Sequence, residues 1–113
     1  MGPTIYHNPR CSKSRLTLEL LEKRGLKPHV IEYLKTPPTA SELKTILGLL
    51  GLHARDLIRK ADAADAGIDP TKTNEKTLIA AMVKSPILIE RPIVVHNGKA
   101  AIGRPPETVL KIL

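Results

Sequence analysis

The chain has 113 residues, enough for one ordinary domain, and its core must be aliphatic because Leu, Ile and Val supply 32 residues while Phe and Trp are absent. One cysteine excludes an intrachain disulfide and a cysteine-based zinc cage, and neither a membrane-length apolar run nor a signal-peptide pattern is seen, so we expect a soluble, cytoplasmic protein with no metal and no membrane association. The net charge of +7 fits a solvated basic surface or a small anion bound by several arginines better than nucleic acid, because the basic residues are scattered and two Tyr offer little for bases to stack on.

The first third of the chain predicts a strand, a helix and a second strand. Residues 4–7 are β-branched or aromatic, and Asn8-Pro9 ends the run. Leucines at helical spacing predict a helix from Ser12 to about Arg24, which Gly25 is placed to terminate. Residues 29–33 predict the second strand. This order is typical of a right-handed βαβ crossover.

The middle of the chain is predicted to be helical. Thr39 and Glu42 have the spacing of a capping box at the start of a helix that ends before Gly51. A short second helix is expected over residues 54–60, followed by a loop over residues 61–72. Asn74 can cap a third helix, which stops before Pro86.

The last third returns to strands. Residues 93–95 and 100–102 flank Asn97-Gly98, and this pair is a strong hairpin signal because a type I′ turn needs positive φ at both central positions. A final helix is expected to open at Pro105 or Pro106. We therefore predict a single α/β domain over residues 1–113, with a helical insertion at about residues 39–85.

The sole cysteine, Cys11, lies between a predicted strand end and a predicted helix start. There the helix dipole and outward-pointing N–H groups stabilise a thiolate, so the thiol pKa should fall. Arg10, Lys13 and Arg15 add positive charge, whereas the alternative is that Cys11 is only a small buried apolar residue. The spacing to Arg15 does not fit a tyrosine-phosphatase loop. Ser14 replaces the second cysteine of a Cys-x-x-Cys motif, and its hydroxyl is expected to donate to the thiolate or to cap the helix.

These residues resemble a known family. The segment from His7 to Arg15 is similar to the active-site loop of glutaredoxin-coupled arsenate reductases, the ArsC family, and further matches follow in the family's order and spacing at residues 33–38, 57–60, 86–95 and 103–105. The resemblance implies a thioredoxin-like fold, a mixed four-stranded sheet with a helical insertion after the second strand. It also implies reduction of arsenate to arsenite, with glutathione as co-substrate, glutaredoxin as partner and no tightly bound cofactor.

The resemblance also implies roles for single residues. Cys11 matches the nucleophile, and His7 matches a residue thought to lower its pKa, although His7 could equally only pack and hydrogen-bond. Three arginines match the anion-binding set: Arg59, Arg91 and Arg104. Pro92 matches a structural cis-proline that faces the nucleophile loop. Arg10 departs from the family, since a small residue often stands there.

Other classes of function remain open. The superfamily includes Spx-type regulators that bind RNA polymerase, but this chain lacks their second cysteine and carries the arginine set. A glutathione-dependent thiol reductase with another substrate would use the same loop. Each arginine taken singly could also be a solvated surface charge. We expect a monomer that acts on a small oxyanion and binds no nucleic acid.

Overall fold

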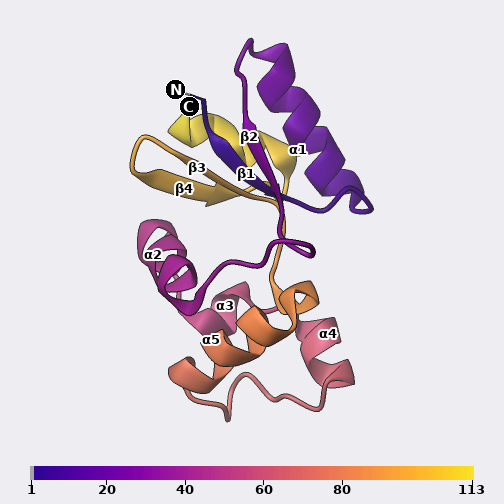
Figure 1. The fold of residues 1–113 in the computed structure, drawn as a ribbon, viewed down its shortest axis with the longest axis vertical. Coiled ribbons are helices and arrows are strands. Elements are labelled where there is room, and N and C mark those ends of the chain that lie inside the picture. The colour runs from indigo at the N-terminus through magenta and orange to yellow at the C-terminus, as the bar shows by residue number, and fades with distance from the viewer. Residues whose placement is uncertain (1) are drawn as a thin grey trace. The chain divides into compact units, whose positions relative to one another are not determined.

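A computed structural model describes residues 2–113, and the chain divides into two compact units (Figure 1). One unit combines residues 2–36 with residues 91–113, and it contains the sheet. The other spans Pro37–Glu90 and contains only helices, with the insertion expected at residues 39–85 lying inside it. The description of residues 1–113 as a single domain stays a prediction. Over residues 2–113, no helix is both long and apolar enough to cross a membrane.

The sheet is mixed and has the order β2-β1-β3-β4. β1 (Thr4–His7) and β2 (His29–Glu32) are parallel, whereas β3 (Ile93–His96) pairs antiparallel with both β1 and β4 (Lys99–Ile102). The hairpin between β3 and β4 turns at Asn97 and Gly98, with φ of 50° and 72°. The predicted strands and turn are therefore confirmed, except that β2 ends one residue early. It ends there because the Glu32 carbonyl accepts from the N–H groups of Lys35 and Thr36 in a turn.

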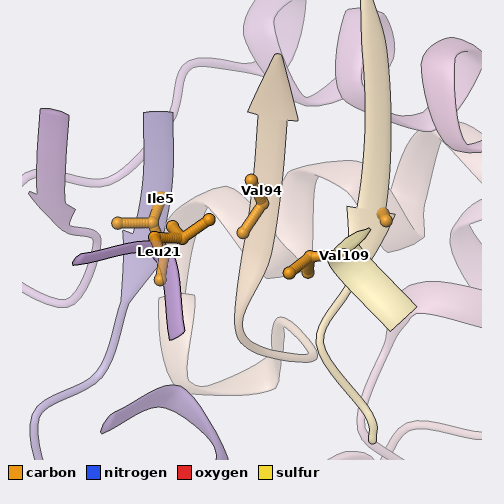
Figure 2. Close-up of a cluster of buried hydrophobic side chains, with 5 residues drawn as sticks. Ile5, Leu21, Val94 and Val109 are labelled. Carbon is orange, nitrogen blue, oxygen red and sulfur yellow. The ribbon is translucent and has the colours of Figure 1, made fainter. Parts of the chain in front are cut away.

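One face of the sheet carries the core of this unit. Helix α1 (Ser12–Lys23) and the 3₁₀ helix η2 (Pro106–Ile112) place Leu21 and Val109 against Ile5 of β1 and Val94 of β3 (Figure 2). Each of these four side chains is fully buried. Burying one such side chain contributes roughly 1.5–3 kcal/mol, so this cluster holds α1 and the loop before it against the strands. The final helix was expected, but it has 3₁₀ rather than α geometry.

The helical unit begins with the predicted capping box. The Glu42 N–H donates to Thr39 Oγ1 at 3.1 Å and the Thr39 N–H donates to Glu42 Oε1 at 3.0 Å, which starts α2 (Ala40–Leu50). Gly51 ends α2 in the left-handed region, with φ of 69°. Asn74 caps α5 (Glu75–Lys84) through the Thr77 N–H, again as predicted.

The segment between these two helices corrects the sequence prediction. The helix expected over residues 54–60 stops early as α3 (Ala54–Leu57), and α4 (Lys60–Asp65) extends into the first part of the expected loop. The cause is a β-bridge between Ile58 and Ile89, after the short 3₁₀ helix η1 (Pro86–Leu88). Across it, the Arg59 N–H donates to the Leu88 carbonyl at 2.7 Å. Pairing with a distant segment therefore breaks a helix that local propensity would continue.

Candidate active site

The loop between β1 and α1 is shaped by Asn8. Its carbonyl accepts from the Cys11 N–H at 3.0 Å, and its Oδ1 accepts from the Arg10 N–H at the same distance. Asn8 is 4% exposed, and its bond to the Arg10 N–H is partly buried. The two bonds hold Cys11 in an extended conformation as the N-cap residue of α1. From the sequence, Asn8 was expected only to end a strand, although an Asn-Pro pair is a turn signal that also fits this role.

The Cys11 sulfur lies at the start of α1, among hydrogen-bond donors. Burial alone would raise the pKa of the thiol, and this is the largest single influence. The backbone N–H groups of Ser14 and Lys13, together with the charge and hydrogen bond of Arg91, outweigh burial and lower the pKa of Cys11 below its ordinary value. The thiolate is the nucleophilic form, so this position favours a reactive cysteine over a merely buried one.

Two arginines from the C-terminal segment of the sheet unit, residues 91–113, reach the sulfur. Arg91 is 8% exposed and precedes Pro92 through a cis peptide bond, which the sequence analysis expected. Arg104 places Nη1 3.9 Å from Cys11 Sγ and donates from the same atom to the Arg91 carbonyl at 3.1 Å. Two guanidinium groups beside a thiolate can hold a tetrahedral oxyanion next to a nucleophile. Arg91 is not the exposed loop charge considered as an alternative.

Gly103 is a site residue that the sequence indicated only as part of the matching segment at residues 103–105. A Cβ atom at this position would lie 2.5 Å from Thr17 Oγ1 and 2.8 Å from Pro92 Cγ. The Thr17 side chain cannot easily move away from such a Cβ atom, because it is fully buried and its hydroxyl donates to the Lys13 carbonyl. The lack of a side chain at Gly103 thus lets the segment that carries Arg104 approach α1. Its place just before Arg104-Pro105 was the available signal.

His7 and Ser14 form a buried pair behind the loop. His7 Nδ1 lies 2.6 Å from Ser14 Oγ, which also accepts from the Asn8 N–H at 3.0 Å. Burial, with a smaller contribution from Arg15, lowers the pKa of His7 against the opposing charge of Glu32, which favours the neutral imidazole. The predicted role of the Ser14 hydroxyl is therefore wrong. Its backbone N–H, and not its hydroxyl, bonds the sulfur, and Cys11 occupies the cap position.

Arg59, the third predicted arginine, lies in the helical unit. Its Nε is 3.4 Å from Asp62 Oδ2 and 3.7 Å from Glu90 Oε1, and its backbone precedes α4. Its convergence with Arg91 and Arg104 stays a prediction. In the described part of the chain, no group of three His, Cys, Asp or Glu side chains is arranged to hold a metal ion.

The chain is similar in sequence and in structure to known proteins. Residues 6–112 match the profile of the ArsC family. The chain is 52% identical to the uncharacterized Escherichia coli protein YfgD, over 96% of this chain and 94% of the relative, and 49% identical to the arsenate reductase of Neisseria meningitidis serogroup A, over 96% of each. The solved structure of an arsenate reductase from Vibrio cholerae superimposes with a TM-score of 0.90 at 51% identity, covering 100% of this chain and 98% of that one.

Proposed function

The chain belongs to the ArsC family and has its thioredoxin-like fold, and from this, together with the geometry around Cys11, we propose that it reduces arsenate to arsenite in the cytoplasm. The observation that carries the proposal is the placement of two arginine side chains, Arg91 and Arg104, beside a thiol whose pKa is lowered. Arsenate reductases at 44–49% identity from several bacteria support the choice of substrate.

In the proposed first step, arsenate binds against Arg91 and Arg104, with Arg59 as a third ligand. The guanidinium groups offset the repulsion between the anion and the thiolate, and they stabilise charge that develops on the arsenate oxygens. The Cys11 thiolate attacks arsenic, an As–S bond forms, and one arsenate oxygen leaves as water after protonation. The product is a thioester of arsenic(V) on Cys11.

Reduction then needs two electrons, and the chain cannot supply them alone because Cys11 is its single thiol. We propose that glutathione replaces a second arsenic oxygen, which again leaves as water. A glutaredoxin thiolate next attacks the glutathionyl sulfur, forming a glutaredoxin–glutathione disulfide. The As–S bond to glutathione breaks with its electron pair retained by arsenic, so arsenic(V) becomes arsenic(III). Water releases arsenite and regenerates the Cys11 thiol, whose low pKa makes it a good leaving group.

A coupled assay tests this proposal. Arsenate, glutathione, glutaredoxin, glutathione reductase and NADPH are combined, and loss of NADPH absorbance reports turnover. The wild-type protein should turn over, and Cys11→Ser should not, while Ser12→Ala, an exposed neighbour, serves as the matched control. Full turnover with thioredoxin and no glutathione would refute the electron route. Activity only on a glutathione mixed disulfide would identify a thiol reductase of other substrate.

A further inference from the structure

Arg59 has two acidic neighbours that its predicted role as an anion ligand does not explain. Its Nε lies 3.4 Å from Asp62 Oδ2 and 3.7 Å from Glu90 Oε1, and the three side chains are only 26–29% exposed. Two carboxylates facing one guanidinium group leave this cluster with more negative than positive charge. Partly exposed ion pairs of this length contribute little to folding stability, so stability alone gives no reason for two of them.

Asp62 contacts the Arg59 side chain because its usual partner is taken. An acid at the third position of a helix commonly accepts from the N–H of the N-cap residue, as Glu42 does from Thr39 in α2. Arg59 is the N-cap residue of α4, but its N–H donates to the Leu88 carbonyl at 2.7 Å. The Asp62 carboxylate therefore faces the guanidinium group instead of the backbone.

Glu90 approaches Arg59 through the β-bridge between the segments at residues 58 and 89. The Glu90 N–H donates to the Leu57 carbonyl at 3.0 Å, so the backbone bonds around the bridge fix Glu90 beside Arg59. Glu90 also directly precedes Arg91, an arginine of the anion site. One acidic side chain thus contacts the predicted third anion ligand and is covalently next to the first.

Both ion pairs of Arg59 use Nε, which has a single N–H donor, whereas the remaining donors are on the two Nη groups. In the part of the chain that the structure describes, no hydrogen bond forms at these Nη groups. They are therefore left for a tetrahedral oxyanion, which a guanidinium group can bind as a fork. A long side chain that is held in place beforehand also loses less freedom when the anion binds.

We propose that Asp62 and Glu90 are positioning residues: they hold the Arg59 guanidinium group at Nε and so present its Nη groups to the oxyanion. This rests on the proposed function for the oxyanion at Cys11 and for Arg59 as its third ligand. Neither carboxylate bonds the anion itself. Their contribution to anion binding should therefore disappear when the Arg59 side chain is removed.

The test is a double-mutant cycle that measures anion binding and not turnover. Alkylation of Cys11 by neutral iodoacetamide is followed at rising arsenate concentration without added thiol, and the concentration that gives half protection is recorded. The substitutions Asp62→Asn and Glu90→Gln are made together in the wild-type protein and in Arg59→Ala. They should raise this concentration about fivefold more in the wild-type background, because Arg59 must then be ordered as the anion binds.

Asp65→Asn is the matched control, because it removes one negative charge from an exposed position of α4, while Arg59 pairs only with Asp62 and Glu90 among the described residues. Loss of a negative charge acts on the anion alike in both backgrounds, so the cycle cancels it, and the control should show no coupling. The rate of Cys11 alkylation without arsenate should stay at the wild-type value in every variant that retains Arg59, because the acids act through Arg59 on the anion.

The outcomes separate this positioning role from the proposed function. Equal effects in both backgrounds, or a wild-type protein that arsenate does not protect, would overturn the positioning role. Coupled protection without arsenite formation in the coupled assay would refute the proposed function and leave the positioning role supported. If urea unfolding shows that the doubly substituted variant does not fold, Asp62→Asn alone replaces it in the cycle, with an expected coupling of about twofold.

Discussion

Replacing Arg91 with Ala removes the guanidinium group that bonds the Cys11 sulfur. Two unit charges about 4 Å apart interact by about 4 kcal/mol at an effective dielectric constant of 20. Because Cys11 is partly open to solvent, we expect a loss of about 3 kcal/mol of transition-state stabilisation, which is a fall of about 10²-fold in kcat/KM for arsenate. Arg104 should keep its anchor, since it bonds the backbone carbonyl of residue 91.

Activity and stability must be measured together, because Arg91 is buried. Losing its packed stem should cost about 1–2 kcal/mol in urea unfolding, too little to unfold the protein under assay conditions. The pH profile of Cys11 alkylation should also move to higher pH, because the charge of Arg91 lowers the pKa of the thiol. Arg91→Lys is the control: it retains the charge but loses the planar fork, so it should recover part of the activity. A loss of less than about tenfold in Arg91→Ala would refute the electrostatic reasoning.

Three further predictions concern stability, each measured by urea unfolding. Burial lowers the pKa of His7, so below about pH 6.5 the unfolded chain binds a proton more readily than the native state does. The free energy of unfolding should therefore fall from pH 7.5 to pH 5.5. A decline of the same size in His7→Gln would show that the pH dependence comes from another group. Thr39→Ala should cost about 1 kcal/mol by removing half of a capping box, with Cys11 alkylation unchanged; a loss below about 0.3 kcal/mol would contradict the cap. Leu21→Ala should cost about 3 kcal/mol, because the side chain is fully buried, whereas Leu16→Ala should cost less than about 0.5 kcal/mol; equal losses would contradict the packing.

The features that the sequence by itself determined are local ones. The capping box of Thr39 and Glu42, the cap at Asn74 and the turn at Asn97-Gly98 were all predicted correctly. Each depends on residues no more than three positions apart, so short-range hydrogen bonds and φ preferences are enough to specify it. Cys11 was assigned to a strand–helix junction for the same reason.

Tertiary structure decided what depends on pairing between distant segments. The bridge from Ile58 to Ile89 ended a helix that local propensity would have continued, and α4 begins only after it. Arg104 reaches the sulfur of Cys11, 93 positions earlier in the chain, because Gly103 leaves room for its segment against α1. Local patterns carry no information about such approaches, and the resemblance to the ArsC family was what indicated that Arg104 belongs to the site. These approaches arise when apolar burial brings the strands and helices together, which a local pattern cannot specify.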